Sequence, residues 1–478
     1  MKKLSKQTVN KPELPVKILQ FGEGNFLRAF VDWMIDKANN AGIMNHGIVA
    51  VQPIAQGMAG MLREQDCMYH VYLEGIKDKK PVKEISLVKS IVDALNPYDE
   101  YEKYKELFLS PELEMIVSNT TEAGIRYEEG DDLTVCPPKS YPAKMTALLY
   151  QRFQKFNGAA DKGLLIICCE LIEDNGSTLR EYVLKYAEYN NLSADFINWV
   201  KTSCHFYDTL VDRIVPGFPR ETINEIKEEI GFDDNLVVKG EYFHVWAIGG
   251  DPVIKEKLPL DKAGLNVLFM DDIRPFRAKK VRILNGAHTA MVQVAMQMGC
   301  ETVMDAFNTP LVEKYINTMV DSEVLPGIGE DMTELRVFSA KILERFYNPY
   351  IKHYLKDISL NSLSKWEARD YPTVCDNSAK LGKLAKLTTF SFAALLVLYS
   401  GKSEAKNFTP NDTPEFVEFI QKTYDANNIE GWVNGIVNNK QIWKENFSSV
   451  PGFIEAVSTD VNLILNKGMK SALEEILK

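Results

Sequence analysis

Three side chains in the second half of the chain could together reduce a ketone without a metal ion. Lys280 is followed five residues later by Asn285 and eight residues later by His288. A lysine ammonium can donate a proton, an amide N–H can stabilise negative charge on an oxygen, and an imidazole can bind a neighbouring hydroxyl. On a helix the three could be brought towards one side, particularly if Gly286 distorts the turn. The spacing alone equally fits a surface lysine and a core histidine with satisfied hydrogen bonds, so both interpretations stay open.

A glycine pair near the N-terminus has the context of a dinucleotide-binding turn. Gly22 and Gly24 follow Val16–Phe21, which predicts a buried strand, and precede a helical pattern over residues 26–42. The N–H groups at the start of a helix suit a pyrophosphate, and glycine lets it approach the main chain. Leu27 occupies the place of the third glycine of the usual fingerprint. A tight turn that needs glycine for backbone reasons is the alternative.

The end of the next predicted strand, residues 48–51, is where NAD and NADP can be distinguished. An acidic residue there binds the ribose 2′-hydroxyl, whereas an arginine accepts a 2′-phosphate. This chain has Gln52 and Pro53 instead. Charge at this position therefore does not decide between the two cofactors.

Strands and helices alternate over the first half of the chain. Further strand candidates lie at 115–119, 164–169 and 267–270, with a possible edge strand at 241–248, and helical patterns lie at 98–109 and 177–188. This alternation indicates the α/β class with a mostly parallel, doubly wound sheet. From about residue 278 onwards the apolar spacing is helical and β-branched runs are scarce. We therefore expect two domains, residues 1–277 around the sheet and residues 278–478 made of helices.

The composition limits the kinds of partner. The 55 Lys and Arg residues against 66 Asp and Glu give a net charge of −11, which argues against general nucleic-acid binding. The longest apolar runs, at 163–171 and 390–399, fall short of the ~20 residues of a membrane span. The N-terminal segment lacks the apolar core of a secretory signal. We expect a cytoplasmic protein with neither nucleic-acid nor membrane partners, and the sequence does not predict its oligomeric state.

No residues have the spacing of a metal site. The seven cysteines and six histidines include no C-x-x-C and no H-E-x-x-H pattern. An odd number of cysteines in a long chain without a secretory signal indicates reduced thiols. We therefore expect no metal.

Several blocks of sequence resemble the mannitol dehydrogenase family of long-chain polyol dehydrogenases. The blocks are FGEGNFLRAF at 21–30, SNTTEAG at 118–124, CELI at 169–172, VDRIVP at 211–216, VRILNGAHT at 281–289 and NPYIKH at 348–353. They occur in the order found in the family, and the resemblance extends from residue 16 to about residue 370. Several independent blocks in the right order are far more specific than any single motif.

The resemblance implies a Rossmann-type N-terminal domain for the dinucleotide, an all-helical C-terminal substrate and catalytic domain, and a cleft between them. It also implies NAD as cofactor and no metal. Position by position, Lys280 matches a general acid/base, Asn285 an oxyanion stabiliser and His288 a contact to a substrate hydroxyl. Asp212 and Lys365 match residues that line the substrate site. The residues that match the cofactor site are Phe21, Gly22, Gly24, Asn25, Phe26, Asn119, Thr121 and Glu122.

Two positions depart from members of the family that act on neutral polyols. Those members have an asparagine where this chain has Leu171, and a substrate-binding arginine where it has Asp357. Basic residues between 345 and 365 could instead bind the carboxylate of a sugar acid, and His353 and Lys365 are our candidates. A solvated charged face is the alternative for any one of these basic residues.

Within the family, the blocks resemble most the members that interconvert D-tagaturonate and D-altronate. The expected activity is therefore NAD-dependent hydride transfer to a small sugar-acid substrate, with a lysine as general acid/base. The alternatives are action on fructuronate or on mannitol, or a dinucleotide-binding regulator without catalysis.

Overall fold

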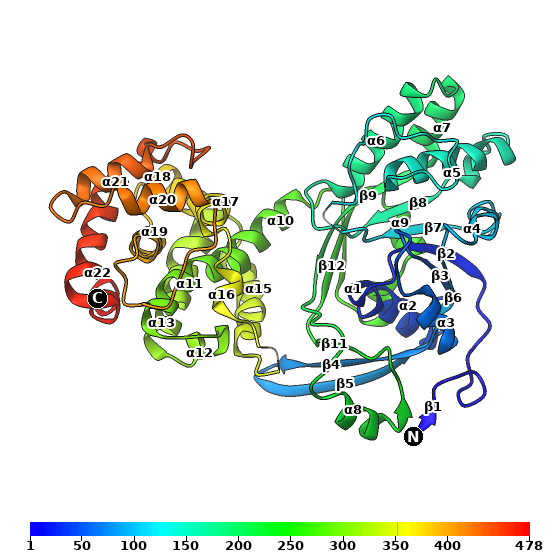
Figure 1. Cartoon of the computed structure of the whole chain (residues 1–478), viewed down its shortest axis with the longest axis horizontal. Coiled ribbons are helices and arrows are strands. Elements are labelled where there is room, and N and C mark those ends of the chain that lie inside the picture. The colour runs from blue at the N-terminus through cyan, green and yellow to red at the C-terminus, as the bar shows by residue number, and fades with distance from the viewer. Residues whose placement is uncertain (122, 351) are drawn as a thin grey trace. The chain divides into compact units, whose positions relative to one another are not determined.

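The computed structural model describes residues 1–121, 123–350 and 352–478, and this part of the chain divides into two units (Figure 1). The first unit comprises Met1–Gly75 and Pro81–Arg274, and the second comprises Ile76–Lys80 and Pro275–Lys478. The short segment Ile76–Lys80 is the tip of a hairpin, and no sequence pattern indicated that it belongs with the helical unit.

Short apolar segments form the sheet of the first unit. In the described residues it has eight strands in the order β13-β12-β9-β8-β7-β2-β3-β6. The strands are β2 (Val16–Phe21), β3 (Gly47–Val51), β6 (Ile91–Leu95), β7 (Met115–Ser118), β8 (Leu165–Cys168), β9 (His205–Asp212), β12 (Val245–Gly249) and β13 (Val267–Met270). The six strands from β6 to β9 are parallel, whereas β12 runs antiparallel to β9 and pairs in parallel with β13. This is the 3-2-1-4-5-6 strand order of a Rossmann fold with two added strands, and it confirms the predicted fold class.

The sheet has a hydrophobic core on each face, because neighbouring residues of its strands point to opposite sides. In β2, Ile18 belongs to one core and Leu19 to the other. In β3, Ile48 and Val49 divide in the same way. The helices and 3₁₀ turns of this unit are α1 (Asn25–Arg28), α2 (Val31–Asn40), α3 (Ala59–Glu64), α4 (Tyr101–Phe108), α5 (Tyr141–Lys155), η1 (Ala160–Lys162), α6 (Asn175–Tyr189), α7 (Ala194–Ser203), α8 (Ile223–Ile230), α9 (Val253–Lys257) and η2 (Leu260–Ala263).

Two smaller sheets complete the strands of the chain. They pair β1 (Lys2–Lys3) with β10 (Phe232–Asp233), and β11 (Val238–Glu241) with β4 (Tyr69–Lys77), which also pairs with β5 (Lys80–Val88). The added strand predicted at 241–248 is confirmed in its second half, as β12, whereas its first residue ends β11 in another sheet. The β4–β5 hairpin turns at Asp78 and Lys79, which both have positive φ, as a tight hairpin turn requires.

Helices dominate the second unit. Its elements are α10 (Arg274–Lys280), η3 (Val281–Gly286), α11 (Ala287–Ala295), η4 (Met296–Met298), α12 (Val303–Phe307), α13 (Pro310–Met319), η5 (Val320–Val324), α14 (Leu325–Ile328), α15 (Met332–Glu344), η6 (Arg345–Tyr347), α16 (Leu355–Ile358), α17 (Ser362–Arg369), α18 (Tyr371–Leu381), α19 (Lys386–Tyr399), α20 (Pro414–Lys422), α21 (Ile429–Val437), η7 (Phe447–Ser449) and α22 (Phe453–Ile476).

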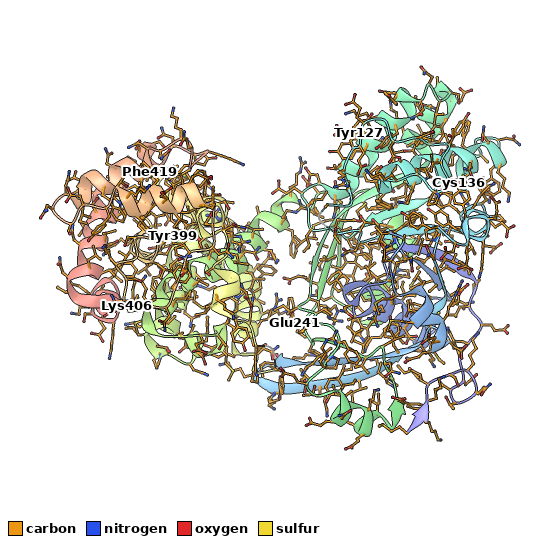
Figure 2. All side chains as sticks on the ribbon, viewed as in Figure 1. Tyr127, Cys136, Glu241, Tyr399, Lys406 and Phe419 are labelled. Carbon is orange, nitrogen blue, oxygen red and sulfur yellow. The ribbon has the colours of Figure 1, made fainter. Side chains whose placement is uncertain are left out.

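The apolar run at 390–399 belongs to α19, the central helix of this unit. Every residue from Leu387 to Tyr399 is buried, and the helix packs against α11 and α22. Tyr399 lies inside the unit, whereas the side chain of Lys406 lies on its surface (Figure 2). Among the described helices, none is both long and apolar enough to cross a membrane.

A buried carboxyl group ties α2 to the sheets of the first unit. Asp32 is fully buried, and its Oδ2 accepts hydrogen bonds from Nε2 of Gln20 at 3.3 Å and from the hydroxyl of Tyr69 at 3.2 Å. Burial raises the pKa of Asp32 to about 7, because the surroundings solvate the charged form poorly.

This raised pKa makes the folded state less stable as the pH rises. An unfolded chain releases the proton near the ordinary value of 3.8, whereas the folded chain holds it up to about pH 7. The contribution of Asp32 is therefore fully present below pH 3.8 and is lost progressively up to about pH 7. We expect Asp32→Asn to gain stability relative to the unsubstituted protein across this window, measured by urea unfolding at several pH values. The exposed Asp271→Asn is the control, and parallel pH curves for Asp32→Asn and the unsubstituted protein would contradict the prediction.

Candidate functional site

The turn after β2 requires glycine at one position and leaves open space at another. Gly22 has φ +120°, and a Cβ atom built on it would lie 2.8 Å from the carbonyl oxygen of Asn119. Its N–H donates to the carbonyl of Val51 at 2.9 Å. Gly24 is exposed, and a Cβ atom built there would meet nothing within 4 Å. The main chain at Gly24 is therefore open to a ligand.

The helix after this turn is broken, so the prediction of one helix over residues 26–42 was wrong. α1 ends at Arg28, Phe30 has φ −127° and ψ −83°, and α2 starts at Val31. Leu27, in place of the third glycine, is buried and packs over Gly22. The ring of Phe26 stacks on Phe30 with centroids 4.9 Å apart.

The predicted cofactor residues lie at the ends of two adjacent parallel strands. The N–H of Asn119, after β7, donates to the carbonyl of Phe21 at the end of β2, at 2.9 Å. These strands flank the point where the strand order reverses, which is where open α/β sheets bind ligands. The structure thus brings together Phe21, Gly22, Gly24, Asn25, Phe26, Asn119 and Thr121, while Glu122 lies outside the described residues. The Asn25 side chain accepts a hydrogen bond from Arg28 at 2.7 Å.

Residues near the end of β3 are already occupied by protein partners. Gln52 is buried, and its Nε2 donates to the carbonyls of Ile54 and Ala55 at 3.1 and 2.8 Å. Arg63 forms ion pairs with Asp93 and Glu100, both at 2.8 Å. The Gln52 amide therefore donates its hydrogen bonds within its own loop. The positive charge of Arg63 is balanced by the two carboxylates.

A π-helical turn carries two of the predicted catalytic residues. η3 connects α10 to α11, with Lys280 as its N-cap residue and Asn285 inside it. Hydrogen bonds of a π-helix join residues i and i+5, so residues five apart, such as Lys280 and Asn285, stack along the helix. His288 follows three residues after Asn285 in α11, the spacing of neighbours on a helix surface. The turn is thus distorted next to Gly286, and the grouping of the three side chains on one side stays a prediction.

Close packing and an ion pair hold the π-helical turn in place. A Cβ atom built on Gly286 would lie 3.0 Å from Oδ1 of Asp370 and 3.3 Å from the carbonyl oxygen of Arg369. Arg282, within the turn, pairs with Asp376 of α18. The glycine therefore permits the turn to lie against the junction of α17 and α18.

His288 has a buried nitrogen with no protein partner. Its ring stacks on Phe346 with centroids 4.2 Å apart and meets His353 edge-on at 5.2 Å. Its Nε2 is buried and has no hydrogen-bond partner in the described part of the chain. Burial lowers the pKa of His288 well below its usual value, and the nearby charges of His353, Arg345, Lys280 and Arg369 lower it further. A neutral imidazole with an unsatisfied nitrogen among the described residues thus lies beside several cations.

The cation next to this site that sequence reasoning missed is Arg369, whose Nη1 donates to Oγ1 of Thr289 at 3.2 Å. It lies one helical turn after Lys365, whose Nζ donates to the carbonyl of Ile358 at 3.0 Å. Burial lowers the pKa of Lys365, and the charge of Arg369 adds to the effect. The i, i+4 spacing of these two basic residues on α17 was the available signal.

The remaining predicted positions lie in the first unit. Asp212 is the last residue of β9 and is half-buried, whereas the neighbouring Arg213 is buried and its guanidinium donates to the carbonyls of Ala29, Tyr242 and Phe243. Leu171 is 66% exposed, just beyond the end of β8.

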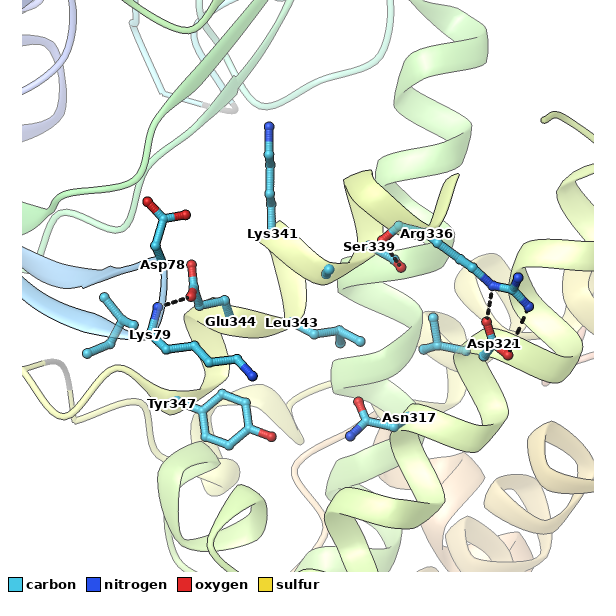
Figure 3. A pocket seen from close by; sticks show the side chains of 13 residues that line it. Asp78, Lys79, Asn317, Asp321, Arg336, Ser339, Lys341, Leu343, Glu344 and Tyr347 are labelled. Carbon is cyan, nitrogen blue, oxygen red and sulfur yellow. Dashed lines mark hydrogen bonds and ion pairs between the residues drawn. The ribbon is translucent and has the colours of Figure 1, made fainter. Parts of the chain in front are cut away.

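A separate groove of about 970 Å³ lies in the second unit (Figure 3). It is bordered by Asp78, Lys79, Asn317, Lys341, Glu344 and Tyr347 among others. The backbone N–H of Lys79 donates to Glu344 at 2.6 Å, and Arg336 pairs with Asp321 at 2.7 Å. None of the predicted site residues that the structure describes lines this groove. No group of three or more potential metal ligands occurs among the residues that the structure describes, and the absence of a metal stays a prediction.

Two family models match almost the whole chain. The mannitol dehydrogenase Rossmann domain matches residues 16–262, and the mannitol dehydrogenase C-terminal domain matches residues 272–465. The chain belongs to the mannitol dehydrogenase family. The family and the oxidoreductase class predicted from the sequence are thereby confirmed.

Relatives of similar length extend this result. Altronate oxidoreductase of Phocaeicola vulgatus is 41% identical over the full length of both chains, and the Escherichia coli protein of the same name is 39% identical with the same coverage. The Bacillus subtilis altronate oxidoreductase is 41% identical and covers 99% of this chain and 98% of its own.

Two solved structures share the fold. Pseudomonas fluorescens mannitol 2-dehydrogenase, in a ternary complex with NAD and D-mannitol, has a TM-score of 0.70 at 24% identity, with 99% of each chain covered. A substrate-free D-sorbitol dehydrogenase has a TM-score of 0.82 at 19% identity, covering 99% of this chain and 100% of its own.

The packing at Gly286 leads to a prediction for the π-helical turn. In Gly286→Ala the new methyl group would press on Asp370 and Arg369 and displace the turn. Small misplacements of catalytic groups cost up to about 10²-fold in rate, so we expect the oxidoreductase kcat to fall at least about tenfold. The matched control is Gly435→Ala, because a Cβ atom there meets nothing within 4 Å. Equal kcat values for the two variants would contradict the prediction.

Proposed function

We propose that this protein is an NAD-dependent oxidoreductase that interconverts D-tagaturonate and D-altronate. The relatives named altronate oxidoreductases are 39–41% identical over essentially the whole chain and support this substrate. The observation that carries the proposal is the set of positive charges around the buried His288 nitrogen, which has no partner among the described residues. Such surroundings favour an anionic sugar over a neutral polyol.

The charges near His288 suit a carboxylate. Lys280, Arg345 and Arg369 are close enough to lower the pKa of its imidazole. Burial raises the pKa of the Asp370 carboxyl well above its usual value, and the charges of Arg369 and Arg282 oppose this shift. A guanidinium binds a carboxylate with paired hydrogen bonds. Arg369 is therefore the strongest candidate to bind the acid group, with Lys365 beside it on α17.

The first unit fits the dinucleotide. The open main chain at Gly24 and the strained Gly22, at the reversal of strand order, are what a pyrophosphate needs to approach the backbone. Bound NAD supplies or accepts the hydride. We therefore assign dinucleotide binding to the sheet-containing unit and substrate binding to the helical unit.

Three residues of the second unit have separate roles in proton transfer, charge stabilisation and substrate binding. Lys280 holds the proton that is exchanged with the substrate oxygen, and Asn285 donates a hydrogen bond to that oxygen as negative charge develops. The neutral His288 binds an adjacent hydroxyl through its free Nε2. The seven cysteines are unpaired, which suits the reducing cytoplasm that we propose as the location.

The substrate is tested by following NADH oxidation with D-tagaturonate, D-fructuronate and D-fructose. The proposal expects the highest kcat/KM with D-tagaturonate. Turnover of D-fructose as efficient as that of D-tagaturonate would refute the assignment.

Lys280→Ala should remove the proton donor. General acid/base catalysis contributes typically about 10²–10⁴-fold, so we expect kcat to fall by that factor while NADH binding is retained. Lys279→Ala is the matched control, because it removes the adjacent lysine and its ion pair with Glu330 and should leave kcat nearly unchanged. Near-normal turnover of the Lys280→Ala enzyme would show that another residue is the proton donor.

Arg369→Gln should weaken binding of the acid group selectively. Removing one charged partner of a carboxylate costs roughly 1.5–3 kcal/mol, which is about a 10–150-fold rise in KM for D-tagaturonate. The residual rate with D-fructose should change little. Arg336→Gln, which removes an exposed arginine paired with Asp321, is the control. Equal losses with both sugars would show that Arg369 does not bind the carboxylate.

A further inference from the structure

Glu170 is a buried carboxyl group near the predicted cofactor loop. It lies two residues beyond the end of β8 and is only 2% exposed. Its carboxylate faces the loop that follows the neighbouring strand β7. Sequence reasoning noted this residue only as part of a family block and gave it no role.

The carboxylate accepts three hydrogen bonds from that loop. Oε1 accepts from the backbone N–H of Thr120 and from its Oγ1, both at 2.9 Å, and Oε2 accepts from Oγ of Ser118 at 3.1 Å. These bonds join the ends of two parallel strands beyond the last ladder pair, Ser118 with Cys168. The loop after β7 is thus fixed to β8 by a side chain.

The opposite loop is fixed in return. Nδ2 of Asn119 donates to the carbonyl of Cys169 at 3.1 Å. Nδ2 of Asn175 donates to the carbonyl of Glu170 itself at 2.9 Å, and to that of Cys168 at 3.0 Å. Each loop therefore holds the other, and the Glu170 backbone is held as firmly as its side chain. The Asn119 amide is directed to the chain just beyond β8.

The held loop has a conformation that needs support. Thr121 has φ +73°, which is unusual for a β-branched residue. A Cβ atom on Gly124 would lie 1.9 Å from Oγ1 of Thr120, so these residues are folded tightly together. The Glu170 bonds to Thr120 sit immediately before the strained residue and can offset its cost.

The loop after β7 also packs against the turn that contains Gly22 and Gly24. The N–H of Asn119 donates to the carbonyl of Phe21, and its carbonyl oxygen is the atom that a Cβ on Gly22 would meet. A displacement of Asn119 would therefore move the turn that leads to Gly24. Glu170 is linked to the glycine turn through two residues, Thr120 and Asn119.

We propose that Glu170 is a positioning residue for the dinucleotide, which fixes the loop after β7 so that the turn at Gly22 and Gly24 is preformed for the phosphates. It touches neither hydride nor substrate. The inference rests on the use of NAD in the proposed function and is independent of which sugar acid is the substrate. Burial raises the pKa of Glu170, so a carboxyl group here is a poor choice for stability alone.

The experiment compares Glu170→Ala, Glu170→Gln and Glu323→Ala. Glu323 is a matched control in the helical unit, because it is also buried and accepts bonds from the N–H of Leu387 and from the N–H and Oγ1 of Thr388. The dissociation constant of NADH is measured by fluorescence titration, together with Tm and steady-state kinetics. A glutamine can keep all three contacts, since its oxygen can accept from Thr120 and its amide can donate to Ser118.

We expect Glu170→Ala to weaken NADH binding about tenfold or more, the loss of roughly one net charged hydrogen bond. Glu170→Gln should restore NADH binding to within about threefold, while Glu323→Ala should lower Tm and leave NADH binding unchanged. KM for the ketose acid should change little in all three. An unchanged NADH dissociation constant in Glu170→Ala, or an equal rise in Glu323→Ala, would overturn the proposal.

A second variant covers the case in which Glu170→Ala does not fold. Thr120→Val removes one donor to Glu170 and keeps the backbone N–H, so it should weaken NADH binding by about threefold or more, and unchanged binding would overturn the proposal. Failure of the proposed function has a different signature, namely that the unsubstituted protein does not bind NADH.

Discussion

Gly286 lies where the π-helical turn meets the start of α18, and the geometry of the helical site depends on that contact. There is no room for a side chain at this position, because a Cβ atom built on Gly286 would lie 3.0 Å from Oδ1 of Asp370. This packing, with the Arg282–Asp376 ion pair, stabilises a helical form in which residues five apart stack. Lys280 and Asn285 are five residues apart, whereas a regular α-helix would place residues with this spacing on different faces.

The first unit uses glycine in a comparable way. Gly22 allows two strand ends to approach, and its backbone rests on the carbonyl of Asn119. In both units a glycine allows two backbone segments to approach closely. Polar side chains then hold these segments in place, namely Glu170 near the glycine turn and Arg282 within the π-helical turn. The chemistry of each site therefore depends on residues that need not touch a ligand.

Sequence patterns predicted β2, β3, β7 and β8 of the parallel sheet because these strands are short apolar runs, but they missed β6 and β9. They failed where tertiary contacts decide. The break between α1 and α2 leaves no mark in the apolar spacing, and the β4–β5 hairpin turns at Asp78 and Lys79 without the usual glycine. The grouping of Lys280, Asn285 and His288 stays a prediction from their spacing. Arg369 was missed because its place beside Thr289 depends on how α17 packs on α11.

The loop after β3 has a consequence for how cofactor preference can evolve in this chain. In many Rossmann folds the residue at this strand end is free to become acidic or basic. Here the Gln52 side chain holds the carbonyls of Ile54 and Ala55 from within, and the carboxylate of Glu23 receives the N–H of Met58. A charged side chain introduced at position 52 would lose the hydrogen bonds to Ile54 and Ala55 that hold this loop. Position 52 is therefore constrained by folding as well as by any contact that it makes with a cofactor.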